Sequence, residues 1–170
     1  MKDSSGARGL ESDRRYRFQV APEEFWSAIG ATESYQRWWP WLRAFEARGL
    51  VAGDVWRCAV RPPLRYTVRF SVHLDEVQRP TLIAAHVEGD IVGTARLAVT
   101  PCDDGCDVRL TSKLAPSQRA LAVVTSFARP LVRRGHDWVL DTGARQFADR
   151  ALAADDMRFC PSGSARSGRR

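Results

Sequence analysis

The longest helical pattern in the chain reads PSQRALAVVTSFARPLVRRGHDWVLDTGARQFADRAL, from Pro116 to about Leu152. A break or a bend is expected near Pro130, because proline removes a backbone hydrogen bond and clashes with the preceding turn. A helix of roughly 30 residues is about 45 Å long and must lie across something broad and apolar. The side chains of its apolar face recur at steps of three and four: Leu121, Val124, Ala128, Leu131, Gly135, Trp138, Val139 and Thr142.

The chain before this helix supplies such a surface as a series of short strands. Apolar and polar side chains alternate in them, which is typical of half-buried strands. Tight turns such as Gly89-Asp90 join consecutive strands, so the pattern predicts an antiparallel meander. The expected strands are Arg14–Val20, Leu42–Leu50, Val55–Val60, Tyr66–Val77, Thr81–Glu88, Ile91–Thr100 and Cys106–Leu114.

Two short helices are expected between the first and second strands. Ala21-Pro22-Glu23-Glu24 begins the first, with proline and acidic residues in the first turn, and Gly30 ends it. Thr32 begins the second, and Pro40 ends it after Trp39. The order of elements predicts an α+β domain, in which a curved antiparallel sheet of about seven strands wraps around the C-terminal helix. A cavity between sheet and helix is the natural place for an apolar ligand.

Composition narrows the function classes. The net charge of +6 is spread over scattered arginines, without the basic stripe or module that nucleic-acid binding needs. No apolar run reaches membrane-spanning length, and residues 1–13 lack the apolar centre of a signal peptide, so we expect a cytoplasmic protein. Residues 14–153 are expected to form one domain, and residues 1–13 and 155–170 to be flexible tails.

The four cysteines, Cys58, Cys102, Cys106 and Cys160, do not have metal-ligand spacing. A zinc site needs a second pair of ligands nearby, so neither a metal nor a cofactor is expected. Cys102 and Cys106 flank a turn, and whether they form a disulfide stays open. Reduced thiols are the usual state in a cytosolic chain.

Few ionisable groups are candidates for chemistry. His136 flanks the apolar stripe of the long helix, where it would serve as an acid or base, and Tyr35 would donate a hydrogen bond. A structural role is the alternative for both. His73 and His86 alternate with inward residues and are expected to face solvent. Arg57 points inward only if the less favoured phase of its strand holds, in which Trp56 and Cys58 point outward.

A set of aromatic, aliphatic and small polar residues is expected to line the cavity. Large flat side chains both wall off a pocket and stack on ring-shaped ligands, although ordinary core packing is the alternative for each. The expected lining is Trp26, Tyr35, Trp39, Trp41, Trp56, Phe70, Val72, Val87, Leu97, Leu110, Ser112, Val124, Ala128, Leu131, Trp138 and Thr142.

Four motifs carry a resemblance to a known family. They are APEEFW (residues 21–26), WWPW (38–41), GDIVGTAR (89–96), and ARPL (128–131) leading to HDWV (136–139). With the order of elements, these resemble the START/Bet v 1-like (SRPBCC) superfamily and, within it, the polyketide cyclase/dehydrase-like group. The resemblance covers about Arg14 to Leu152 and implies the helix-grip fold.

The resemblance implies a fold and a subgroup and leaves the reaction open, because one fold hosts carriers, receptors and enzymes. The favoured function is binding of a small hydrophobic molecule, such as a lipid, polyketide or aromatic metabolite. The alternative is a cyclase or dehydratase that uses the same cavity. A third reading is a filled cavity in a domain that only contacts other proteins. The sequence also leaves a homodimer open.

Overall fold

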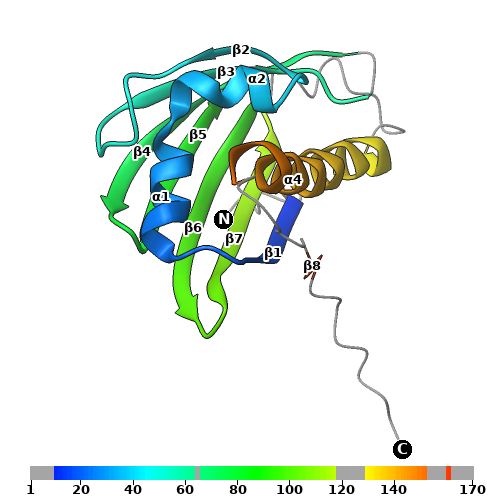
Figure 1. Cartoon of the computed structure of the whole chain (residues 1–170). Helices are drawn as coiled ribbons and strands as arrows, with labels where there is room; N and C mark the ends of the chain where they lie inside the picture. The colour runs from blue at the N-terminus through cyan, green and yellow to red at the C-terminus, as the bar shows by residue number, and fades with distance from the viewer. Residues whose placement is uncertain (1–9, 64–65, 118–128, 153–159, 162–170) are drawn as a thin grey trace, which may run out of the picture.

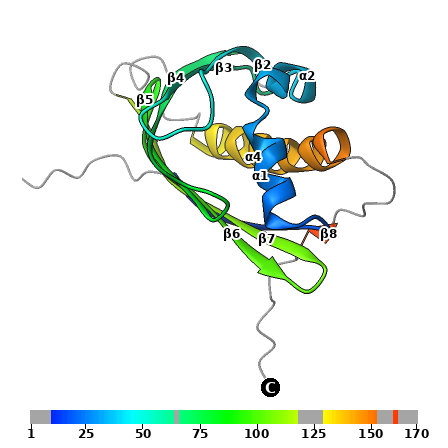
Figure 2. The same cartoon turned by 60° about the vertical axis from the view of Figure 1, so that its left-hand side comes forward.

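The computed structural model describes residues 10–63, 66–117, 129–152 and 160–161. One antiparallel sheet curves around the long helix α4 (Arg129–Ala151), and the shorter α1 (Pro22–Gly30) lies on the same side of the sheet (Figure 1, Figure 2). The strand order is β2-β3-β4-β5-β6-β7-β1-β8. The strands are β1 (Leu10–Phe18), β2 (Leu42–Glu46), β3 (Val55–Val60), β4 (Val68–Gln78), β5 (Leu82–Gly89), β6 (Ile91–Cys102), β7 (Gly105–Pro116) and the two-residue β8 (Cys160–Pro161).

This architecture confirms the predicted α+β helix-grip arrangement of seven long strands. The second short helix also forms, as a 3-10 turn, Thr32–Ser34, that leads into α2 (Tyr35–Trp38). Glu23 and Glu24 lie in the first turn of α1, and proline stands at its start, as expected. Among the described helices, none is long and apolar enough to cross a membrane.

Three predicted boundaries are wrong. β1 begins at Leu10 rather than Arg14, because the twelve-residue β7 offers pairing partners as far as Leu114. Pro116 belongs to β7 rather than to the long helix, since the β6–β7 ladder continues to the pair Ile91 and Pro116. The strand expected over Leu42–Leu50 ends at Glu46.

The chain termini also differ from the expected tails. Residues 10–13, expected in the N-terminal tail, pair with β7. Cys160 and Pro161, expected in the C-terminal tail, pair with Arg17 and Tyr16 at the edge of β1. Part of each expected tail therefore extends the sheet.

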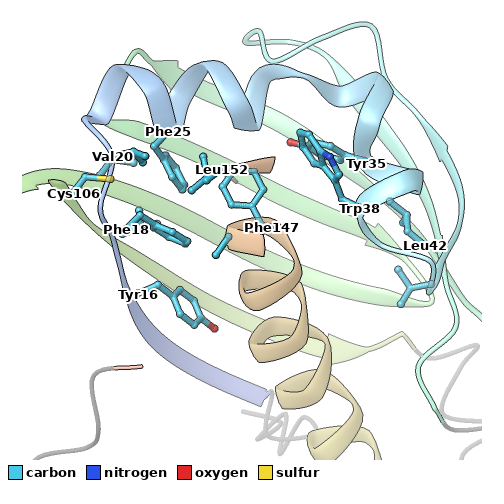
Figure 3. Close-up of a cluster of buried hydrophobic side chains, with 14 residues drawn as sticks. Tyr16, Phe18, Val20, Phe25, Tyr35, Trp38, Leu42, Cys106, Phe147 and Leu152 are labelled. Carbon is cyan, nitrogen blue, oxygen red and sulfur yellow. The ribbon is translucent and has the colours of Figure 1, made fainter. Parts of the chain in front are cut away.

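The main core lies between α1, the C-terminal half of α4 and one end of the sheet (Figure 3). Phe25 from α1 meets Phe18 from β1 at a ring-centroid distance of 5.1 Å and Phe147 from α4 at 5.5 Å. Cys106 at the start of β7 is fully buried beneath them. Burial of these rings, each worth about 1.5–3 kcal/mol, fixes this half of α4 on the sheet.

The Cys102–Cys106 hairpin carries free thiols. Cys102 pairs with Gly105 and Cys106 with Pro101, and both cysteines, like Cys58, are free. Burial raises the pKa of the Cys106 thiol to about 11 and that of Cys58 to about 12, so both stay protonated near neutral pH. These thiols behave as small apolar side chains in the core.

Candidate functional site

The concave face of the sheet is built of rows of side chains that run across the strands. One row has four small residues in succession before it ends at Leu74 in β4: Ser12 pairs with Ser112, Ser112 with Ala95, and Ala95 with Ala85. We call these four residues the small-residue row. Small side chains leave room above the backbone, so this row forms the floor of any space between the sheet and α4.

Aliphatic rows flank the small-residue row on both sides. Leu110 pairs with Leu97 on one side, and Val87 pairs with Val72 on the other. Val87 is buried, whereas Val72, Leu97 and Leu110 are only partly buried, although they point toward α4. Phe70 stands two residues before Val72 in β4, so it points to the same face, and it is partly buried too. Apolar side chains on the covered face of the sheet thus keep contact with solvent.

Backbone geometry requires glycine at one position beside this row. Gly93 in β6 lies between Val87 and Leu114 on the concave face. Its φ is +146°, and a Cβ added there would approach the carbonyl oxygen of Lys113 to 1.9 Å. Only glycine fits such a conformation and such a close approach. Glycine at this position therefore allows the close approach of β6 and β7 in the row next to the small-residue row.

His136 of α4 lies over the end of the small-residue row. Its Nε2 is 3.4 Å from Ser12 Oγ and 3.5 Å from Ser112 Oγ, and the two hydroxyls are 2.8 Å apart. Burial lowers the pKa of His136, and the nearby Asp137 only partly opposes this. The imidazole is therefore neutral near neutral pH, when it can accept or donate a hydrogen bond or take up a proton.

Arg14 is an inward cation that the sequence analysis missed. Its guanidinium lies 2.8 Å from Asp137 Oδ1 and 3.8 Å from Asp141 Oδ1, so β1 is tied to α4. The Tyr16 hydroxyl also donates to Asp141 at 3.2 Å. Strand alternation contained the signal, because Arg14 shares the register of the inward Tyr16 and Phe18.

Tyr35 lies in the core and away from His136. It is 3% exposed, and its hydroxyl donates to the carbonyl oxygen of Ile29. Burial raises its pKa well above that of a free phenol. The ring packs among Trp38, Trp39, Phe45 and Trp56 at centroid distances of 4.6–5.9 Å. In this setting Tyr35 stabilises α2 against β2 and β3, and its hydroxyl already has a partner.

Trp39 and Trp41 hold α4 from the side opposite β1. The Trp39 indole donates to the Gly143 carbonyl at 2.9 Å, and the Trp41 indole donates to Gln146 Oε1 at 2.9 Å. Trp138 meets Trp41 edge to face at a centroid distance of 6.4 Å. All three tryptophans are only partly buried, so they form an aromatic wall beside α4 that solvent reaches.

The other expected lining residues are dispersed. Trp26 is buried under α1 against Leu74 and Ile83, away from α4. Trp56 contacts both the main core and the smaller cluster around Trp26, and its indole donates to the Gly49 carbonyl. Thr142 is partly buried on α4. Val124 and Ala128, and the side chain of Leu131, lie outside the described residues.

The remaining candidate side chains lie on the outer face. Arg57 is exposed and paired with Glu46 at 3.7 Å, so the favoured phase of β3 is confirmed. An open hollow of about 600 Å³ lies behind the small-residue row. Its walls are outward side chains of β1, β4, β5, β6 and β7: Glu11, Asp13, Asp75, Ala84, Thr94, Arg96, Thr111 and Lys113. It faces away from α4.

Comparisons with known proteins agree with this geometry. No curated protein matches the chain significantly. The Zhui aromatase/cyclase from Streptomyces sp. R1128 superposes with a TM-score of 0.67 at 13% identity, covering 85% of this chain and 93% of that one. A START superfamily protein from Mycobacterium smegmatis superposes with a TM-score of 0.62 at 13% identity, covering 86% and 98%. These likenesses show the fold.

A family model described as polyketide cyclase/dehydrase and lipid transport matches residues 11–151. The match covers β1 through α4, which contain the small-residue row, the aromatic wall and His136. The chain therefore belongs to the polyketide cyclase/dehydrase and lipid transport family.

Proposed function

We propose that this protein binds a small, largely apolar molecule between the sheet and α4. The observation that carries the proposal is the partial exposure of Val72, Leu97 and Leu110 on the face that α4 covers. A core closed by protein alone would bury such side chains, because each gains about 1.5–3 kcal/mol from full burial. A ligand over the small-residue row would complete that burial.

One polar corner would orient the ligand. The hydroxyls of Ser12 and Ser112 and the neutral ring of His136 converge at 2.8–3.5 Å, next to the aliphatic rows. A few placed polar groups in an apolar site are typical of pockets that recognise one end of a ligand. The expected ligand is therefore an apolar body, flat enough for the aromatic wall, with one hydroxyl or carbonyl oxygen.

The direct experiment is native mass spectrometry of the purified protein, followed by extraction of the bound molecule. We expect a co-purified apolar metabolite in wild type and less of it in Ser112→Leu, which fills the polar corner. Lys113→Leu, on the adjacent residue but the outer face, is the matched control and should keep the ligand. Equal occupancy in all three proteins would contradict the proposal.

A second candidate is a cyclisation or dehydration reaction in the same space. The observation that favours it is the neutral, partly buried His136 beside two hydroxyls, which suits a general acid or base. The aromatase/cyclase named among the similar folds agrees with this candidate. The polar groups around His136 are engaged with each other, and Arg14 is engaged with Asp137, so we favour binding.

His136→Gln separates the two functions. If the protein is a carrier, ligand affinity changes by less than about 1.5 kcal/mol, the scale of one neutral hydrogen bond. If it is a cyclase that uses this ring, turnover falls by about 10²-fold or more while affinity is kept. Isothermal titration and product analysis with the extracted ligand distinguish the two results.

We also propose a cytoplasmic location, which the free thiols of Cys58, Cys102 and Cys106 support because they suit a reducing compartment.

A further inference from the structure

The two histidines on the outer face of the sheet belong to a cluster that ligand binding does not explain. His73 in β4 is directly opposite His86 in β5, so both rings project from the same face. The rings are stacked, with centroids 4.5 Å apart and an interplanar angle of 10°. Glu88 lies two residues beyond His86 and therefore on the same face.

We propose that His73, His86 and Glu88 form a binding site for one divalent transition-metal ion of the zinc class. Each residue offers one ligand atom, and the three atoms lie within 4.8 Å of one another. His73 Nε2 and Glu88 Oε2 are 3.5 Å apart. Ligands about 2.0–2.2 Å from a tetrahedral zinc ion are roughly 3.3–3.5 Å from each other, so this pair already has the required separation.

A neighbouring carboxylate prepares His86 for this role. Its Nδ1 lies 2.7 Å from Asp75 Oδ1, and a carboxylate can only accept in that hydrogen bond. The proton is therefore on Nδ1, and Nε2 keeps the free lone pair. A histidine that donates its second nitrogen to a carboxylate is the common arrangement around protein-bound zinc.

The Asp75 carboxylate lies at an irregularity in β4. The β4–β5 register shifts between Leu74 and Glu76, so Asp75 is the extra residue of a bulge. Bulges re-aim side chains. As the extra residue, Asp75 has no register partner in β5, and its carboxylate lies against the ring of His86. Three features therefore bring the four side chains together: the pairing of His73 with His86, the alternation along β5 that puts Glu88 on the same face, and the bulge at Asp75.

The ligand set determines the class of metal. Two imidazoles with one carboxylate suit zinc and its neighbours, whereas magnesium and calcium prefer oxygen ligands. Three protein ligands leave a fourth position for water, as in open zinc sites. Side-chain exposures of 29% for His73, 42% for His86 and 66% for Glu88 give an ion access from solvent. They also leave the rings room to turn out of their parallel stack, so that both lone pairs point at one ion.

Titration of Zn²⁺ into the full, tag-free chain by calorimetry tests the site, with Mg²⁺ as the comparison ion. We expect one equivalent of Zn²⁺ and no Mg²⁺ to bind. His73→Gln and His86→Gln should each weaken Zn²⁺ binding by at least 10-fold. Asp75→Asn, which keeps all three ligands, should weaken it by about 10–100-fold, as for other groups that orient metal ligands. His136→Gln, the matched histidine control on α4, should bind Zn²⁺ as wild type does.

Two further measurements keep the test independent of folding and of the cysteines. Zn²⁺ should raise the melting temperature of wild type but not of His86→Gln, because a ligand stabilises only the state that binds it. Bound Co²⁺ should show no sulfur-to-metal charge-transfer band. Unchanged Zn²⁺ affinity in both histidine variants, or a cobalt–sulfur band at the one-equivalent point, would overturn the proposal.

Discussion

At the scale of single residues, the environment of His136 couples the proposed ligand site to pH. Burial disfavours the imidazolium, and the carboxylate of Asp137 only partly offsets this. Arg14, which faces the same stretch of α4, opposes the charge further. The hydroxyls of Ser12 and Ser112 complete the surroundings and carry no charge.

This lowered pKa predicts a loss of stability in mild acid. The unfolded chain takes up a proton near the ordinary histidine pKa of about 6.5, whereas folded His136 takes it up only at lower pH. Between these two values the unfolded state binds more protons, so stability falls as the pH falls through that window. In chemical denaturation at pH 7.5 and 5, His136→Gln should lose less stability than wild type. An identical loss in both proteins would show that His136 titrates normally.

Arg14 joins the first long strand to the helix at the polar corner. Its side chain and that of Asp137 are 34% and 37% exposed, so solvent screens the pair and its contribution is about 1 kcal/mol or less. Arg14→Met should therefore lower the melting temperature by about 2–4 °C. Lys113→Met, which removes the exposed pair with Glu11, should change it by less. Equal shifts measured by differential scanning fluorimetry would contradict the structural role of Arg14.

At the scale of elements, α4 is held along its length by different forces. Phe147 anchors its C-terminal half in the core, whereas Trp39 and Trp41 reach it through indole hydrogen bonds. Gly143 allows this approach, because a Cβ there would come within 3.3 Å of the Trp41 ring. Apolar and polar contacts therefore hold the C-terminal half of the helix together.

Replacing one indole donor tests this attachment. Trp39→Phe keeps an aromatic ring but removes the donor to the Gly143 carbonyl, and should cost about 0.5–1.5 kcal/mol in free energy of unfolding. Trp41→Phe, which leaves Gln146 free to bind water, should cost less from the lost hydrogen bond. Urea denaturation compares the two, and a larger loss for Trp41→Phe would mean that stacking dominates over hydrogen bonding.

Alternation and turn residues predicted nearly every element, but they could not place the ends. The phase of β3 followed from Trp56 and Cys58, and the inward face of β5 from Ile83 and Val87. Pro116 suits either the end of a strand or the start of a helix, and only its pairing with Ile91 decides. Pairing between residues far apart in the chain cannot be read from a short stretch of sequence.

At the scale of the whole molecule, only part of the proposed site followed from the sequence. The periodicity of the C-terminal stretch placed His136 beside the sheet, and β7 alternation placed Ser112 on the inner face. Ser12 was missed because the first strand was started too late, and Arg14 was missed although it lay in the predicted strand, in the register of the inward Tyr16 and Phe18. The small-residue row was missed because it exists only across strands, through the pairing of Ala85 with Ala95 and Ala95 with Ser112.

The cluster of His73, His86 and Glu88 on the outer face was missed for the same reason, because it too depends on pairing across strands. His73 and His86 were assigned to the outer face, where they lie, but their direct opposition depends on the β4–β5 register, which the bulge at Asp75 shifts. A sequence search for metal ligands looks for short spacing along the chain. Cross-strand ligands have a spacing set by the fold.

The central claim is that space for an apolar ligand exists above the small-residue row, inside the curve of the sheet. Ala95 and Thr94 are consecutive in β6 and point to opposite faces, and Ala95 is only partly buried. Leucine at either position adds a similar side chain, but only Ala95→Leu fills the proposed space. Near-UV circular dichroism of each variant checks that the fold is kept.

Fluorescence titration with 1-anilinonaphthalene-8-sulfonate, after removal of any co-purified ligand, makes the comparison. We expect saturable binding of one dye molecule to wild type and to Thr94→Leu, and at least 10-fold weaker binding to folded Ala95→Leu. Binding to Ala95→Leu as tight as to wild type, or its loss in Thr94→Leu alone, would contradict an internal ligand site.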